Sequence, residues 1–263
     1  MNESSGVSDR PIRLNLGCGE TYLEDWVNID APQAEGSHGA FRVDLTADIS
    51  TLEYPAETVE EILMNAVFEH FQRHEALRIL RKFYCWLKNE GKVTIVVPDF
   101  WGSIAKLKKS KSVAERAFWY RHLFGPQDHP HYGNHLDGFE KQRLKETFNV
   151  VGFTDLKIRS FGAMPFLKVE AIKHAPATSD LVFKKRAADY LIFHEYRAVP
   201  GSCFAEWLKA LAIDPEEIGF TPPKAVFSTQ KENLKTILKK ILKRIVGAGY
   251  YEKMKRSRKH DHC

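Results

Sequence analysis

Two glycines near the N-terminus could let the backbone approach a ligand closely. Gly17 and Gly19 flank Cys18 directly after the apolar segment Leu14–Leu16. Because glycine has no Cβ, a strand that ends in Gly-x-Gly leaves room for a bound molecule. The third glycine of a dinucleotide-binding fingerprint would fall at Tyr22, so a tight pyrophosphate contact is not expected.

Two carboxylates follow the glycine loop at the expected ends of the next two strands. Asp30 ends the segment Trp26–Asp30, where an acid can accept hydrogen bonds from both hydroxyls of a ribose. Asp44 ends Phe41–Asp44, where a carboxylate can accept from an adenine amino group. Aspartates are also common in turns. Together with the glycine loop, however, the three strand ends favour a site for an adenosine without phosphates.

The elements that would position these residues alternate between strands and helices. This pattern predicts an α/β fold with a doubly wound, mostly parallel seven-stranded sheet. The last two strands are separated only by a turn near 162–165, so the last strand should be antiparallel. We expect strands at 11–16, 26–30, 41–44, 59–64, 92–97, 154–158 and 166–173, and helices at 76–87, 102–124 and 139–150.

The motifs LNLGCG, WVNID, VDLT, NAVFEHF and VTIVVPDF resemble those of the class I S-adenosylmethionine-dependent methyltransferases. The chain is most similar to a compact bacterial-type group in which the LNLGCG loop is followed closely by a WxNxD segment. The later segments GPQDHPHYGNHLDGF and VGFTDLKI look like that group's final loop, helix and strand. The resemblance covers residues 11–174 and implies S-adenosylmethionine as the cofactor.

The resemblance also implies roles for residues that match the family's motifs. Gly17, Cys18 and Gly19 would pass under the methionine part of the cofactor, and Asp30 would hold its ribose. Adenine would be held by Asp44 and Leu45, and the reactive sulfonium would lie near Asn65 and Ala66.

The chain departs from the family's pattern at two of these positions. Asn15 stands where many members have an acid that contacts the cofactor's amino group through water, and we place it among the cofactor-binding residues. Ala66 stands where related sequences often have a histidine. An NPPY-type motif is absent after the fourth strand, which disfavours amide and adenine N-methylation.

An oxygen acceptor would gain from a general base, and histidine is the usual one near neutral pH. The loop 125–138 contains His129, His131 and His135, and Asp99 follows another strand. We assign His135 as the catalytic base, with Asp99 as the other candidate. An alternative is that these histidines are exposed or pack structurally.

Other chemical roles for these residues are less favoured. The spacing of the three loop histidines matches no standard ligand motif, so no metal site is predicted. Glu69 and His70 are interpreted as residues that cap or orient the start of a helix.

Charge separates the body of the chain from its tail. Residues 231–263 hold 11 of the 39 Lys and Arg residues and 3 of the 34 Asp and Glu residues, so residues 1–230 carry a net charge of −3. A basic patch restricted to the tail argues against a nucleic-acid partner. The pattern of residues 232–246 predicts an amphipathic helix. This helix could pack on the core, bind a partner or lie on an anionic membrane surface. The positive charges that follow it, up to residue 259, favour the membrane surface slightly.

Localisation is indicated by what the sequence lacks. No apolar run is long enough to cross a bilayer and no secretory signal is visible, while the four cysteines form no CxxC pair. These features favour the cytoplasm, with a peripheral position at the inner membrane face as an option. We therefore divide the chain into a flexible N-terminus (1–10), a methyltransferase domain (11–175), a helical accessory region (176–230) and the basic tail (231–263).

The leading hypothesis is a methyltransferase that acts on a hydroxyl of a sugar or small metabolite. Similar enzymes often act in surface-polysaccharide biosynthesis, which the resemblance implies for this chain too. One alternative is a catalytically silent cofactor-binding module, tethered by its tail to a membrane or an enzyme complex. Another is a nucleotide-sugar or dinucleotide enzyme. The oligomeric state and the acceptor are not determined by the sequence.

Overall fold

The computed structural model describes residues 11–32, 41–128, 133–194 and 203–220. The basic helix expected at 232–246, the N-terminal segment 1–10, and the loop residues His129 and His131 lie outside the described residues. No helix among the described residues is long and apolar enough to span a membrane.

The structure is built on one seven-stranded sheet in the order β3-β2-β1-β4-β5-β7-β6. β7 runs antiparallel to both β5 and β6, and the other pairings are parallel. The predicted α/β sheet with an antiparallel last strand is therefore confirmed. The strands are β1 (Ile12–Leu16), β2 (Val27–Asp30), β3 (Leu45–Thr46), β4 (Val59–Asn65), β5 (Leu87–Pro98), β6 (Asp155–Phe161) and β7 (Phe166–Ile172).

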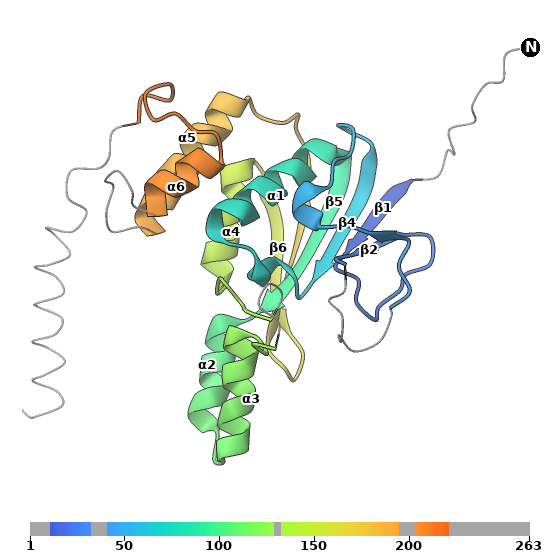
Figure 1. Cartoon of the computed structure of the whole chain (residues 1–263), viewed down its shortest axis with the longest axis vertical. Helices are drawn as coiled ribbons and strands as arrows, with labels where there is room; N and C mark the ends of the chain where they lie inside the picture. Colours follow the sequence, from blue (N-terminus) through green and yellow to red (C-terminus); the bar gives the residue numbers. More distant parts are fainter. Residues whose placement is uncertain (1–10, 33–40, 129–132, 195–202, 221–263) are drawn as a thin grey trace, which may run out of the picture.

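The helices fall into two groups (Figure 1). Four of them pack together beside the sheet, and a pair, α2 and α3, projects beyond its edge. The packed helices are α1 (Arg73–Trp86), α4 (Lys141–Val151), α5 (Asp180–Leu191) and α6 (Cys203–Ala210). The projecting pair is α2 (Phe100–Lys109) and α3 (Val113–Phe124), and the short 3-10 helices are η1 (Ile49–Thr51), η2 (Phe68–His70) and η3 (Ile192–His194).

The two faces of the sheet differ in polarity. Residues that alternate along the strands share a face, and one set is buried and apolar: Leu14, Leu16, Ile29, Ile62, Met64, Val93, Ile95, Val97, Leu167, Val169 and Ala171. The opposite set includes the ion pairs Lys92–Glu61 at 2.6 Å and Arg159–Glu170 at 2.7 Å. Within the described residues, helices therefore cover one face, and no described helix connects β1 to β2 or β2 to β3.

Three expected element boundaries were wrong. The single helix expected at 102–124 is two helices, because Ser112 accepts a hydrogen bond from the Glu115 N–H and begins a new helix. The strand expected at 92–97 begins earlier, at Leu87, directly after α1 ends at Trp86. The expected third strand at 41–44 lies later, at β3.

Helices α5 and α6 belong to the same hydrophobic core as the sheet. Phe183 and Leu191 of α5 and Phe204 and Leu208 of α6 are buried in one cluster with the side chains of α1 and the strands. Hydrogen bonds also join residues 176–194 to the rest of the fold. One runs from the Arg81 guanidinium of α1 to the Thr178 carbonyl. The described part of 176–230 thus stabilises the helical layer.

Candidate functional site

The loop between β1 and β2 is held at the end of the sheet by backbone hydrogen bonds. The N–H groups of Gly17 and Cys18 both donate to the carbonyl of Ile29, at 2.8 and 3.1 Å. Gly17 and Gly19 have positive φ angles of 68° and 51°, which glycine adopts without strain. Burial and the nearby Asp30 carboxylate raise the pKa of the Cys18 thiol, so this side chain stays neutral.

The two glycines serve different purposes. A Cβ added to Gly17 would lie 2.4 Å from Cγ2 of Val67, so glycine is needed there for packing. A Cβ added to Gly19 would meet nothing within 4 Å of it. The space beside Gly19 is therefore open, which fits a loop that a ligand passes closely.

Asp30 lies directly beside this open space. Its Oδ2 accepts a hydrogen bond from the Gly19 N–H at 2.6 Å, and its Oδ1 accepts from the Ala31 N–H at 2.7 Å. Each carboxylate oxygen can accept more than one hydrogen bond. Both oxygens of the half-buried Asp30 can therefore still accept from the hydroxyls of a ribose.

Asn15 has a structural partner that the sequence did not single out. Its buried amide donates to the Thr21 carbonyl at 2.8 Å and to Oδ1 of Asn28 at 2.9 Å. Asn28 is fully buried and also accepts from the Leu23 N–H and donates to the Leu23 carbonyl. Asn15 and Asn28 together fix the loop that carries Gly19. The sequence offered one sign of this role: Asn28 is a polar residue in the middle of a short apolar strand.

Asp44 does not end a strand, so this part of the interpretation was wrong. Its carboxylate accepts from the backbone N–H and side-chain amide of Asn28, and from the hydroxyl of Tyr22. These bonds, first of all the one from the Asn28 backbone, lower the pKa of Asp44. The protein therefore uses Asp44 to join β2 to the segment before β3.

Residues of β3 and the segment after it lie at the same edge of the sheet as Asp30. The strand partner of Asp30 is Thr46, and Leu45 is 41% exposed. The first carboxylate after the end of β3 is Asp48, which caps η1 by accepting from the Ser50 N–H. Asp48 was overlooked because the third strand was expected too early.

Asn65 ends β4, the strand beside β1, and Ala66 follows it; both residues are exposed. Leu16 pairs with Met64, so Gly17 and Asn65 leave adjacent strands at the same edge. Ala66 has a positive φ of 55°, a strained conformation for a residue with a Cβ. This strain occurs where the sequence predicts the reactive end of the site.

A hollow of about 310 Å³ opens beside Ala66. This volume lies in the range typical of small-molecule sites. The hollow is lined by Ala66, Glu69, Pro98, Phe118, Arg121, His122, Pro126, His135, Met164 and Phe166. Ala66 and His135, 69 positions apart in the printed sequence, are thus brought to one place.

His135 is held in one orientation by a backbone contact. Its Nδ1 lies 3.2 Å from the Leu123 carbonyl, which can only accept, so Nδ1 carries the hydrogen and Nε2 the lone pair. Burial, followed by the neighbouring His70, lowers the pKa of His135 to about 4. The imidazole is therefore neutral near pH 7, with Nε2 free to accept a proton or bind a cation.

Asp99 has a capping role. It is the N-cap of α2, where its Oδ1 accepts from the Gly102 N–H at 3.0 Å. Its Oδ2 accepts from the Ser160 hydroxyl at 3.2 Å. Asp99 is not among the residues that line the hollow, although its neighbour Pro98 is.

Glu69 and His70 do not cap the following helix, contrary to the sequence interpretation. The N-cap of α1 is Gln72, whose backbone N–H donates to the Glu75 carboxylate at 3.1 Å. The Glu69 side chain is buried, and neither of its oxygens has a hydrogen-bond partner among the described residues. Burial raises the pKa of Glu69 to about 8.

The seven-stranded sheet with one antiparallel strand agrees with the expectation from the sequence. No protein-family model matches the chain, and no curated protein matches it. Among solved structures, several that are described as S-adenosylmethionine-dependent methyltransferases share part of the fold.

Three of these similar structures show the extent of the likeness. Human N-acetylserotonin methyltransferase with S-adenosylmethionine is 13% identical, with a TM-score of 0.42, over 63% of this chain and 48% of that one. For the methyltransferase SibL the identity is 16% and the TM-score 0.42, over 66% and 53%. For a possible exported protein of Bordetella parapertussis the values are 12% and 0.42, over 63% of each chain. This chain thus spans less than two thirds of the length of each of these proteins.

Proposed function

We propose that the protein is an S-adenosylmethionine-dependent methyltransferase that methylates a hydroxyl group. The observation that carries the proposal is the contact between the Gly19 N–H and Asp30 beside open space. It lies at the carboxyl ends of β1 and β2, next to the point where the strand order reverses. Open α/β sheets bind their ligands at this point.

The residues present fit the cofactor. Asp30 offers a carboxylate to the ribose, Gly19 leaves room for the methionine part, and the exposed Leu45 offers an apolar surface to the adenine. When bound, the cofactor supplies a methyl group that is already activated as a sulfonium. The protein's task is then to position an acceptor and help to remove its proton.

The hollow beside Ala66 is the proposed acceptor site. Its lining combines aromatic side chains, Phe118 and Phe166, with polar ones such as Arg121 and His122. A few polar groups on an otherwise apolar wall are typical of sites for small ligands. This composition supports a sugar or a small metabolite with several hydroxyls as the acceptor. A place in surface-polysaccharide biosynthesis, at the cytoplasmic side of a membrane, is part of the same proposal.

Calorimetric titration with S-adenosylhomocysteine tests the cofactor site. We expect micromolar binding by the full chain and at least about a 10-fold weaker affinity in Asp30→Asn, which keeps the shape but loses the negative charge. Asp25→Asn is the matched control, because Asp25 is exposed in the same loop region and should be dispensable. Absence of binding by a folded wild-type protein would refute the proposal.

A panel of hydroxylated acceptors then tests the reaction. Formation of S-adenosylhomocysteine in the presence of one class of acceptor, and not without it, is the expected result. Cofactor binding without turnover on any acceptor would favour the catalytically silent module instead. Competition by NAD or a UDP-sugar would indicate a dinucleotide or nucleotide-sugar enzyme.

A further inference from the structure

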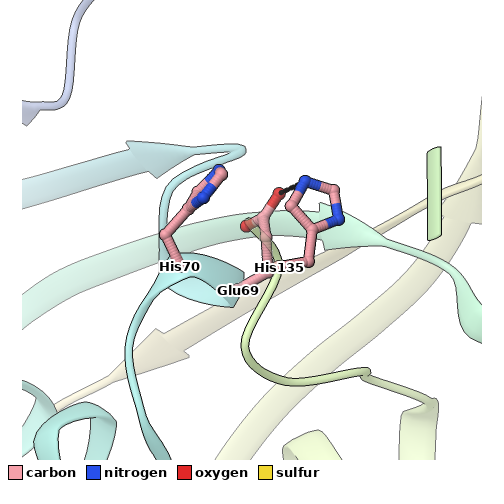
Figure 2. A group of neighbouring side chains, drawn as sticks. All are labelled: Glu69, His70 and His135. Carbon is pink, nitrogen blue, oxygen red and sulfur yellow. Dashed lines mark ion pairs between the residues drawn. The ribbon is translucent and has the colours of Figure 1, made fainter. Parts of the chain in front are cut away.

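A carboxylate and two imidazoles beside the hollow have ligand atoms that lie close together (Figure 2). One ligand atom from each of Glu69, His70 and His135 lies within 4.8 Å of the others. Glu69 and His70 come from η2 and His135 from the loop before α4. The sequence did not indicate this group, because its members come from two segments that are far apart in the chain.

Glu69 is the unusual member of the group. Its side chain is only 2% exposed, and both carboxylate oxygens lack a hydrogen-bond partner within the described part of the chain. Nε2 of His135 lies 3.9 Å from Oε1 of Glu69, which is too far for a hydrogen bond. A buried carboxylate without partners is costly unless it is protonated, paired or bound to a metal.

The two histidines are prepared to act as ligands through Nε2. Nδ1 of His70 lies 2.9 Å from the Asn134 carbonyl, and Nδ1 of His135 lies 3.2 Å from that of Leu123. Because a carbonyl only accepts, each Nδ1 carries the hydrogen and each Nε2 keeps its lone pair. Histidines that bind metals are oriented in this way by a backbone carbonyl or carboxylate behind the ring.

We propose that Glu69, His70 and His135 bind a divalent transition-metal ion beside the hollow. Two imidazoles and one carboxylate suit ions such as Zn²⁺ or Fe²⁺, and three protein ligands leave coordination positions open. Ligands at about 2.1 Å from a tetrahedral ion are roughly 3.4 Å apart. The group must therefore contract slightly when the ion binds.

Two of the proposed ligands, Glu69 and His135, also line the hollow beside Ala66, so a molecule in the hollow could reach an open coordination position. If the proposed function holds, an acceptor hydroxyl would bind there, and the ion would lower the pKa of that hydroxyl so that its proton passes to water. His135 would then be a ligand and not the base. The metal site itself does not depend on the proposed function.

The test is titration of the chelator-treated, untagged full chain with Co²⁺, followed by visible absorption and by calorimetry. The background carries His260→Ala, His262→Ala and Cys263→Ser, which removes potential ligands at the C-terminus. We expect one ion per chain, and at least about a 100-fold loss of affinity in Glu69→Gln and in His135→Ala, because each removes a ligand. His174→Gln, an exposed histidine elsewhere, should bind as the parent does.

Folding and cofactor binding are followed on the same samples. Glu69→Gln keeps the shape and is neutral without having to take up a proton on folding, so it should fold at least as stably as the parent without metal. Failure to bind Co²⁺ and Zn²⁺, or undiminished binding by a folded Glu69→Gln variant, would overturn the proposal. Metal binding without S-adenosylhomocysteine binding would instead overturn the proposed function alone.

Discussion

The side-chain amide of Asn15 donates a hydrogen bond of 2.9 Å to Oδ1 of Asn28, between the neighbouring strands β1 and β2. The other end of the Asn28 amide donates to the Leu23 and Trp26 carbonyls and to Oδ2 of Asp44. One buried amide thus holds the glycine loop on one side and the segment before β3 on the other. The shape of the proposed cofactor site therefore depends on the N–H groups of the Asn28 amide.

Asn28→Asp should therefore destabilise the protein more than its small size change suggests. The substitution places a carboxylate oxygen opposite three acceptors, one of them the charged Asp44. We expect the free energy of unfolding to fall by about 3 kcal/mol or more, measured by urea denaturation at pH 8. The double variant Asn28→Asp/Asp44→Asn restores a donor and should recover part of the loss. No recovery would show that the amide network is not the cause.

The two glycines of the loop should respond differently to alanine. Gly17→Ala introduces a Cβ 2.4 Å from Cγ2 of Val67 at a φ of 68°, so we expect a loss of about 2–4 kcal/mol in unfolding free energy. Gly19→Ala meets open space and should cost only about 1 kcal/mol. Its effect should instead be weaker S-adenosylhomocysteine binding, because the Cβ enters the proposed ligand space.

A double variant separates packing from backbone strain at Gly17. Val67→Ala in the Gly17→Ala background removes the methyl groups that the new Cβ meets and should restore the packing part of the loss. If denaturation shows no coupling between the two substitutions, the close contact does not explain the requirement for glycine. Equal loss of ligand affinity in both glycine variants would likewise contradict the division of roles.

The sequence predicted the sheet and the glycine loop because both depend on local patterns. Apolar strands that alternate with an amphipathic helix indicate the layers, and Gly17 and Gly19 mark a loop by their type. The position of β3 could not be predicted, because a two-residue strand has almost no pattern and Asp44 looks like a strand end. Its hydrogen bonds to Asn28 are visible only in three dimensions.

The interpretation of Glu69 failed for a different reason. A glutamate near the start of a helix can take part in a capping box, and only the fold shows that Gln72 and Glu75 form the one that begins α1. Glu69 lies near His135 because the loop that contains His135 returns to η2. There the Leu136 N–H donates to the Glu69 carbonyl at 2.8 Å. A contact between such distant segments cannot be deduced from one sequence.

We expect the free energy of unfolding to fall in acid because the fold lowers the pKa of His194 in η3. Burial, followed by the cations of Arg143 and Arg73, lowers its pKa to about 4, while its ring packs against Tyr190 at 4.6 Å. The same two arginines are ion-paired with Asp137. The unfolded chain takes up a proton near pH 6.5 and the folded chain does not, so stability is present above pH 6.5 and is lost as the pH falls toward 4.

His194→Gln should reduce the loss of unfolding free energy between pH 7.5 and 5 by about 1 kcal/mol. Denaturation curves at the two pH values measure this difference. His174→Gln is the control of opposite sign, because hydrogen bonds to Glu90 and Asp155 raise the pKa of His174. An unchanged acid slope in His194→Gln would show that this histidine does not contribute.

Asp99 should prove to be a capping residue and not the catalytic base. Asp99→Ala removes the acceptor for the Gly102 N–H at the start of α2 and should lower the free energy of unfolding by about 1 kcal/mol. Asp99→Asn keeps a good N-cap but cannot take up a proton, so it should retain both its stability and its turnover rate, measured once an acceptor is known. If a stable Asp99→Asn variant instead turned over at least about 100-fold more slowly than the parent, Asp99 would be the base after all, because only the ability to accept a proton distinguishes the two proteins.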